Sequence, residues 1–297
     1  MRTVFLGTSA FATAVLERLA ASEHRPSLVV TRPDRPAGRG QKLAAPPIVE
    51  AARAMDIEVF QPQSVNDEAA RARIAAERPD VVCVCAFGAL IKPPLLSDFE
   101  MLNVHPSLLP RWRGAAPIER AIMAGDTETG VSIMRVTAGL DSGPVCLAAP
   151  EPIRPDDTYG SLAARLQDMG GALLLRALDD RPPFTDQDEA EATYADKIES
   201  GDRTLDPSRP AIELERAVRA LHPHIGARVA LPDGSHLRVL AAAALDRGPP
   251  QGDFGAADGR FALGCAEGAL ELLAVQPPGG RPMQAADYLR GHGVPGA

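Results

Sequence analysis

The sequence predicts an α/β protein with two parts, a doubly wound (Rossmann-like) domain followed by a small β-barrel domain of the oligonucleotide-binding (OB) type. Apolar strand-like runs alternate with amphipathic helical patterns over residues 1–180, which is typical of a parallel sheet with helices on its faces. Residues 181–206 are polar and contain several prolines, as linkers between domains do. Residues 207–297 hold one helical pattern and then short strand-like runs between glycine turns, which favours a small barrel.

The elements of the first part follow from the spacing of apolar residues and from the glycines, prolines and polar residues that interrupt it. The expected strands are 2–7, 28–31, 58–60, 80–86, a run ending at residue 105, 131–136 and 144–149. The expected helices are one that carries Phe11, Val15, Leu16 and Leu19, and those near 48–55, 67–76, 115–123 and 158–178. The turn at residues 7–11 lacks the glycines of a dinucleotide fingerprint, so no nicotinamide or flavin site is expected, and Ser9 is the predicted N-cap of the first helix.

The second part begins with a predicted helix and continues with strands. The helix is expected at 211–221, and the strands at 227–231, 237–242, 261–265 and 270–275. Pro232-Asp233-Gly234 and Glu267-Gly268 supply turns between these runs. Several short strands in fewer than about 100 residues indicate a small barrel.

Composition describes a protein that folds in water, with 45% hydrophobic and 24% charged residues. No apolar run reaches membrane-spanning length, and the start of the chain lacks the pattern of a signal peptide, so a cytoplasmic protein without a membrane partner is expected. The formal net charge of −8 argues against indiscriminate nucleic-acid binding, although it allows a local basic surface.

The four cysteines point to neither a metal nor a disulfide. Cys83 and Cys85 lie two apart in an apolar run that is predicted to be a buried strand, so we interpret both as small core residues. A C-x-C pair without a neighbouring His or further Cys is poor evidence for zinc.

A positively charged loop, residues 32–42, follows the second predicted strand. It carries four basic residues against one acidic residue: Arg32, Arg35, Arg39 and Lys42, with Asp34. Its glycines and prolines disfavour regular structure, so a mobile loop is expected. A short charged run is usually a solvated surface loop, but this one could also be an arm that contacts RNA phosphates.

The candidate catalytic residues lie where the strand ending at residue 105 leaves the predicted sheet. Asn103 and His105 are two apart and therefore face the same side of that strand, at the edge where open α/β sheets bind ligands. An amide N–H can stabilise an oxyanion and an imidazole can move a proton at neutral pH, so the pair suits acyl transfer. The turn at 138–143 presents Asp141, whose carboxylate could orient the imidazole and favour its charged form. Each of these residues could also be an ordinary polar group of a loop.

These residues and their surroundings resemble the folate-dependent formyltransferases. The resemblance is carried by Asn103, by the run His105-Pro106-Ser107-Leu108-Leu109-Pro110 and by Asp141 in a glycine-rich loop. The longer run SLLPRWRGAAPIERAIMAGDTETGVSIMRVTAGLDSG is similar to that of the members that act on methionyl-tRNA. The resemblance implies transfer of a formyl group from 10-formyltetrahydrofolate, a cosubstrate rather than a permanently bound cofactor, to the amino group of methionyl-initiator tRNA. A monomer is expected.

The resemblance also implies roles for individual residues. Asn103 would donate to the oxyanion, His105 would donate beside it or move protons, and Asp141 would act on His105 and accept the proton of the amine. The expected folate-binding residues are Phe87, Gly88, Leu90, Ser107, Leu108, Leu109 and Pro110. A basic loop contacts tRNA in these relatives, so the predicted tRNA-binding residues are Arg35, Arg39 and Lys42.

Other positions remain open or differ from the family pattern. Arg111 and Arg113 could contact the acceptor stem or the folate tail, or could be simple surface arginines. The Ser107 hydroxyl has no paired base in view and is expected to fix its proline-bracketed loop. The segment at residues 221–227, Leu-His-Pro-His-Ile-Gly-Ala, stands where many members of the family it resembles have Asn-Pro-Trp-Pro, so an aromatic anchor at the start of the second part is altered.

Three alternative functions fit parts of the sequence. One is a hydrolase that releases formate from the same folate, and another is an enzyme that formylates a small amine. The third is an RNA-binding module without chemistry. The basic loop and the second part argue against the first two, and the presence of Asn103, His105 and Asp141 together argues against the third.

Overall fold

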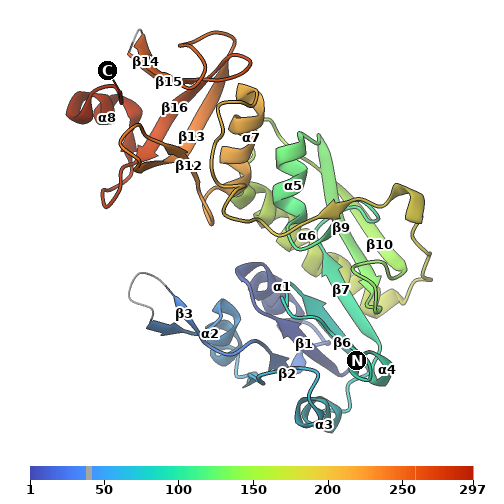
Figure 1. Ribbon diagram of the computed structural model, residues 1–297. Helices are drawn as coiled ribbons and strands as arrows, with labels where there is room; N and C mark the ends of the chain where they lie inside the picture. The colour runs from blue at the N-terminus through green and yellow to red at the C-terminus, as the bar shows by residue number, and fades with distance from the viewer. Residues whose placement is uncertain (38–41, 258, 297) are drawn as a thin grey trace. The chain divides into compact units, whose positions relative to one another are not determined.

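The computed structural model describes residues 1–37, 42–257 and 259–296, and the chain divides into two compact units (Figure 1). The first unit comprises Met1–Pro117, Glu128–Pro152 and Ala163–Ala195. The second unit comprises Ile118–Thr127, Ile153–Leu162 and Asp196–Ala297. Each unit has its own sheet, so the predicted α/β class with a separate β-rich second part is confirmed.

The first unit is built on a seven-stranded sheet with the order β10-β9-β7-β6-β1-β2-β5. Its strands are β1 (Thr3–Gly7), β2 (Pro26–Val30), β5 (Glu58–Phe60), β6 (Val81–Cys85), β7 (Met101–His105), β9 (Glu128–Arg135) and β10 (Val145–Pro152). Neighbours from β7 to β5 pair in parallel, whereas β9 runs antiparallel to both β7 and β10. Both β1 and β6 are buried along their whole length, which explains why they lack polar alternation.

The longer helices of the first unit agree with the apolar patterns, whereas a short helix at Leu95–Asp98 was not predicted. The helices are α1 (Ala10–Ala20), α2 (Pro47–Ala54), α3 (Glu68–Ala76) and the short α4 (Leu95–Asp98), while α5 (Pro117–Ala124) and α6 (Tyr159–Asp180) contribute residues to both units. The four apolar residues predicted to form the buried face of α1 are all buried. The Ser9 hydroxyl accepts a hydrogen bond from the Ala12 N–H, so the predicted N-cap is confirmed.

The basic segment differs from the irregular loop that the sequence predicts. Strand β3 (Arg35–Ala37) pairs antiparallel with β4 (Lys42–Ala44). Residues 38–41, between these strands in the sequence, lie outside the described part. The prediction of a loop without regular structure is therefore wrong for these two strands. Glycine and proline disfavour strands in isolation, but pairing between two short segments gives their backbone groups hydrogen-bond partners.

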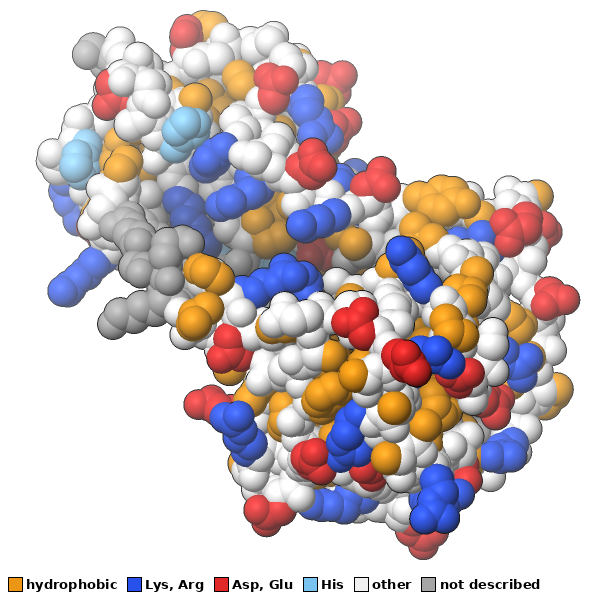
Figure 2. All heavy atoms as spheres, turned by 60° about the horizontal axis from the view of Figure 1, so that its bottom comes forward, with side chains coloured by type: hydrophobic (Ala, Val, Ile, Leu, Met, Phe, Trp, Pro, Cys, Tyr) orange, Lys and Arg blue, Asp and Glu red, His pale blue; other side chains and the backbone are white. Residues whose placement is uncertain are grey.

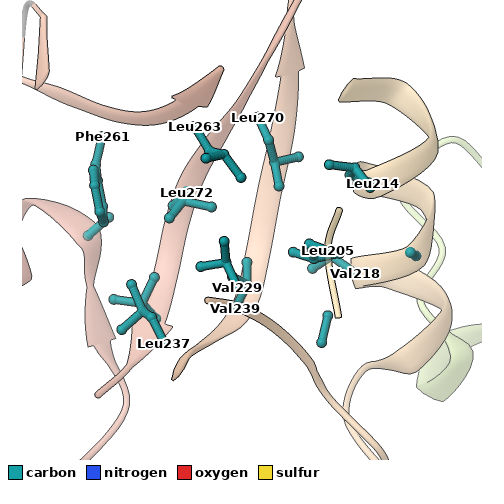
Figure 3. Packing of buried hydrophobic residues seen from close by; sticks show 14 of the residues in the cluster. Leu205, Leu214, Val218, Val229, Leu237, Val239, Phe261, Leu263, Leu270 and Leu272 are labelled. Carbon is teal, nitrogen blue, oxygen red and sulfur yellow. The ribbon is translucent and has the colours of Figure 1, made fainter. Parts of the chain in front are cut away.

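The second unit contains helix α7 (Ala211–Leu221) and an antiparallel sheet, consistent with an OB-like domain. The sheet consists of β12 (Ala227–Ala230), β13 (His236–Leu245), β14 (Phe254–Ala257), β15 (Arg260–Gly264), β16 (Ala269–Gln276) and β17 (Met283–Gln284), and α8 (Ala285–His292) follows. Leu214 and Val218 of α7 point toward sheet residues such as Val239 and Leu270 (Figure 3). This single apolar cluster holds the helix to the sheet.

The second unit contains an aromatic contact made by His224. The His224 ring stacks on Tyr159, with ring centroids 3.6 Å apart, and its Nε2 lies 2.9 Å from Glu119 Oε1. His224 therefore supplies both a stacking face and a polar contact.

The segment that the sequence predicts as a linker makes specific contacts with both units. A 3₁₀ turn covers Glu189–Glu191, and β11 (Tyr194–Ala195) pairs in parallel with β8 (Arg113–Gly114) of the first unit. Farther on, Leu205 is buried in the apolar cluster of the second unit. The chain between residues 181 and 206 is therefore held along much of its length.

Candidate active site

The carboxyl ends of β6 and β7 bring the central candidate residues to one edge of the first unit's sheet. These strands are parallel neighbours, with Val84 opposite Asn103 and Cys85 opposite Val104. Residues 86–91 leave β6 at this edge, and the segment that begins at Pro106 leaves β7 there as well. Open parallel sheets bind ligands in this position, because the loops that follow the strands meet there.

His105 is held between a backbone carbonyl and a carboxylate. Its side chain is almost completely buried, at 4% exposed. The Nε2 atom lies 2.9 Å from the Trp112 carbonyl oxygen, and since a carbonyl only accepts, Nε2 carries a proton and donates it there. The Nδ1 atom faces Asp141 Oδ2 at 3.6 Å, too long for a hydrogen bond but close enough for an ion pair when the ring is protonated. The structure thus brings together His105 and Asp141, which are far apart in the sequence.

Asp141 is fixed in an uncommon backbone conformation. Its φ angle is +45°, in the left-handed region that non-glycine residues rarely adopt and that is common at functional sites. Its Oδ2 accepts a hydrogen bond of 2.9 Å from the Gly114 N–H. The carboxylate therefore contacts the segment after β7 as well as the imidazole.

Asn103 lies on β7 two residues before His105, on the same side of the strand. Its side chain is half-buried, and within the described ranges (1–37, 42–257 and 259–296) no hydrogen bond engages its carboxamide. The amide N–H groups are therefore available to an oxygen of a bound molecule.

The residues expected to bind folate occupy two loops at this edge. Phe87 is buried, and its carbonyl accepts a hydrogen bond of 2.8 Å from the Thr8 hydroxyl, whereas Leu90 is 62% exposed. Gly88 has φ +69°, and a Cβ there would approach the Arg32 guanidinium at 3.2 Å, so this position favours glycine. Leu108, Leu109 and Pro110 are half-buried.

Ser107 has a different environment from the other residues of its loop. It is fully buried, and its hydroxyl donates to the Arg111 carbonyl at 2.6 Å. The prediction that this hydroxyl fixes its own loop is confirmed. Because the side chain is enclosed by protein, it supports the loop rather than facing a bound molecule.

The structure contradicts both interpretations of Arg113, as a substrate contact and as a surface arginine. Its side chain is 2% exposed and makes two hydrogen bonds, of 2.9 and 2.8 Å, to the Glu189 carboxylate, which raises the pKa of the guanidinium. It is therefore neither a surface arginine nor free for a substrate. Arg111 is exposed, with its guanidinium carbon 4.5 Å from the centre of the Trp112 ring. No local sequence signal identifies Arg113 as buried, because its partners lie more than 70 residues away in the chain.

The residues predicted to bind tRNA are described only in part. Arg35 is exposed, whereas Arg39 and the Lys42 side chain lie outside the described part. Figure 2 shows that Lys and Arg side chains are interspersed with Asp and Glu on the face it draws. No continuous basic surface is needed for a few phosphate contacts, which single exposed cations can supply.

Cys83 and Cys85 are core residues, as predicted. Cys83 and Cys85 are both fully buried in β6, and burial raises the pKa of the Cys83 thiol to about 12 and that of Cys85 as well. Within the described residues, no group of three or more His, Cys, Asp or Glu side chains could hold a metal ion, and no helix is long and apolar enough to cross a membrane.

Comparison with known proteins identifies similar chains over the full length of this one. The family model described as Formyl transferase matches residues 1–178, and that described as Formyl transferase, C-terminal domain, matches residues 197–293. A methionyl-tRNA formyltransferase of Methylococcus capsulatus is 44% identical over 100% of this chain and 98% of its own, and one of Ectopseudomonas mendocina is 45% identical over 97% of this chain and 93% of its own.

Solved structures share the fold at low sequence identity. A methionyl-tRNA formyltransferase from Clostridium thermocellum aligns with a TM-score of 0.62 at 14% identity, over 82% of this chain and 93% of its own. HypX from Aquifex aeolicus in complex with tetrahydrofolic acid aligns with a TM-score of 0.64 at 18% identity, over 97% of this chain and 47% of its own. With both family models matched and relatives more than 40% identical along its length, the chain belongs to the formyl transferase family.

Proposed function

We propose that this chain transfers the formyl group of 10-formyltetrahydrofolate to the free amino group of methionyl-initiator tRNA, giving formylmethionyl-tRNA for translation initiation. The observation that carries the proposal is its identity of 44–45% to curated methionyl-tRNA formyltransferases across both units. The carboxyl edge of the sheet, where His105 faces Asp141, supports the same assignment.

The geometry at this edge supports the following catalytic roles. The amine attacks the formyl carbon, and the carbonyl oxygen becomes an oxyanion to which the Asn103 amide donates. Since His105 Nε2 is engaged by the Trp112 carbonyl, Nδ1 is the atom that can move a proton. Asp141 lies beside Nδ1 and accepts the proton that the amine loses, directly or through water. His105 Nδ1, protonated by way of Asp141, delivers the proton that the folate nitrogen takes up as its bond to the formyl carbon breaks.

The substrates would contact the loops around these residues. The folate ring lies against Phe87, Gly88 and Leu90 on one side and the loop at residues 108–110 on the other, with Ser107 supporting that loop from within. The basic segment at residues 32–42, through Arg35, Arg39 and Lys42, contacts tRNA phosphates, and the second unit supplies further tRNA contacts.

The proposed domain organisation is a catalytic domain at 1–180, a linker at 181–206 and a tRNA-binding OB-like domain at 207–297. The family matches over residues 1–178 and 197–293 support this division. We further propose that the protein acts in the cytoplasm and that it is a monomer. Light scattering of the purified protein would test its oligomeric state.

The decisive experiment measures formyl transfer from 10-formyltetrahydrofolate to charged initiator tRNA. Elongator methionyl-tRNA and folate alone serve as controls. Asn103→Ala and His105→Ala should each lower kcat by about 10²–10⁴-fold, whereas Glu17→Gln, at an exposed site on α1, should not change it. Formate release without formylated tRNA would instead assign a hydrolase, and tight tRNA binding without turnover would assign a binding module.

A further inference from the structure

Gln187 bridges the Asp141 loop and a buried arginine. Its Nε2 atom donates to the Asp141 carbonyl at 2.8 Å and to the Gly143 carbonyl at 2.6 Å. Its Oε1 atom accepts from Arg113 Nε at 3.0 Å. Carbonyls only accept and a guanidinium only donates, so the chemistry of the three partners fixes the orientation of the amide. The half-buried side chain thus uses both of its polar atoms.

The other end of this bridge is firmly anchored. Arg113 is 2% exposed, and Glu189 binds two of its guanidinium nitrogens. The Arg113 backbone N–H donates to the Thr193 carbonyl at 2.9 Å, in the region where β8 pairs with β11. A bidentate arginine pair on a paired strand is a rigid support for a neighbouring amide.

The Asp141 loop needs such a support. Asp141 has φ +45°, and backbone in this region persists only when its surroundings hold it there. Gly143 packs so closely that a Cβ there would clash with the Arg135 carbonyl oxygen. The Asp141 carboxylate is tied to the Gly114 N–H, so the main chain and the side chain of Asp141 both connect to the β8 region.

We propose that Gln187 is a positioning residue that, through its bonds to the Asp141 loop and to Arg113, holds the Asp141 carboxylate beside His105. The inference rests on the proposed function, since it concerns the acceptor of the amine's proton. Gln187 does not touch the reacting atoms. It acts on the reaction by fixing the main chain on which the Asp141 carboxylate is carried, and it comes from the segment predicted as a linker.

The test compares Gln187→Met with native protein. Methionine keeps the length of the side chain but neither donates to the loop carbonyls nor accepts from Arg113. Asp186→Ala is the matched control, because Asp186 is an exposed neighbour in the same segment. Misplacement of a catalytic group by about 1 Å costs about a hundredfold, so kcat should fall by about 10- to 100-fold while the KM values for folate and tRNA stay within about threefold.

A double-mutant cycle separates positioning from a general loss of structure. In the Asp141→Asn background, Gln187→Met should change kcat by less than about twofold, because the group that it positions is gone. An equal loss in both backgrounds would overturn the proposal, and so would a native kcat for Gln187→Met. If Gln187→Met does not fold, Gln187→Asn, whose shorter amide cannot reach all three partners, replaces it in the same cycle.

This inference and the proposed function fail in different ways. An inactive Asp141→Asn with a native kcat for Gln187→Met overturns only the positioning role. A native kcat for Asp141→Asn overturns the catalytic role of Asp141 and, with it, the function of its support. A crystal structure of Gln187→Met should show the 138–143 loop displaced from His105, and an unmoved loop would contradict the proposal.

Discussion

Gly114 is the position at which one added methyl group should affect both stability and the candidate site. Its φ angle is +125°, a conformation available in practice only to glycine, and its N–H is the donor to Asp141 Oδ2. A Cβ at this position would lie 2.7 Å from the Ala195 carbonyl oxygen on the paired strand. Gly114→Ala must therefore shift backbone, because neither atom belongs to a flexible side chain.

The cost of this substitution has two sources. A disfavoured backbone conformation costs about 1–3 kcal/mol, and overpacking against a fixed neighbour costs about 1–3 kcal/mol more. Together they lower the free energy of unfolding by roughly 2–6 kcal/mol. At roughly 2–4 °C per kcal/mol for a protein unit of this size, the Tm should fall by roughly 5–20 °C. A displaced Gly114 N–H would also release the Asp141 carboxylate, with a loss of about a hundredfold in kcat.

Calorimetry and the formyl-transfer assay measure the two effects separately. Gly201→Ala is the matched control, since a Cβ there meets no atom within 4 Å and the glycine has no positive φ. We expect the control to keep native Tm and kcat. If Gly114→Ala unfolds within about 2 °C of the control and has the same kcat, the β8–β11 contact is not the constraint described here.

Two further predictions concern ionisable groups. Burial raises the pKa of the Cys83 thiol to about 12 and raises that of Cys85 as well, so neither thiol should react with Ellman's reagent at pH 8 in the native state. The half-buried Cys146 should react first. Rapid modification of more than one thiol before unfolding would contradict this prediction. The hydrogen bond from Arg120 lowers the pKa of Asp202, so its contribution to stability is present above the unfolded pKa of about 4 and is lost as pH falls through the folded value. Urea unfolding between pH 6 and pH 3 should therefore show a smaller loss of stability for Asp202→Asn than for native protein, and parallel curves would refute the assignment.

Elements with strong periodicity could be predicted from the sequence. The helix at 211–221 has the bounds that the apolar spacing predicts, since burial of one face leaves a regular pattern. The strand at 58–60 also has its predicted bounds, although none of its three residues is buried. Strand β14 and helix α8 were not predicted. The run Phe254–Ala257 is short, contains glycine and has only partly buried or exposed side chains, so pairing with β15 rather than its own pattern makes it a strand.

The candidate site could likewise be predicted only in part from the sequence. Asn103, His105 and Asp141 could be chosen from the sequence, because residue type and position after a strand carry chemical meaning without any distance. Whether the imidazole meets the carboxylate depends on how β7, β8 and the loop at 138–143 pack, and local sequence does not contain that information.

The sequence by itself determined the α/β class, the succession of the two parts and the chemical character of the central residues, because these depend on local periodicity and on side-chain type. Only the tertiary structure decided the tautomer of His105, the burial of Arg113 and the role of Gln187 in the Asp141 loop. The carbonyl that fixes the His105 tautomer belongs to Trp112, in the loop that follows the same strand, whereas the contacts of Arg113 and Gln187 join segments more than 40 residues apart. All of these contacts exist only when packing and backbone pairing are satisfied over the whole unit at once.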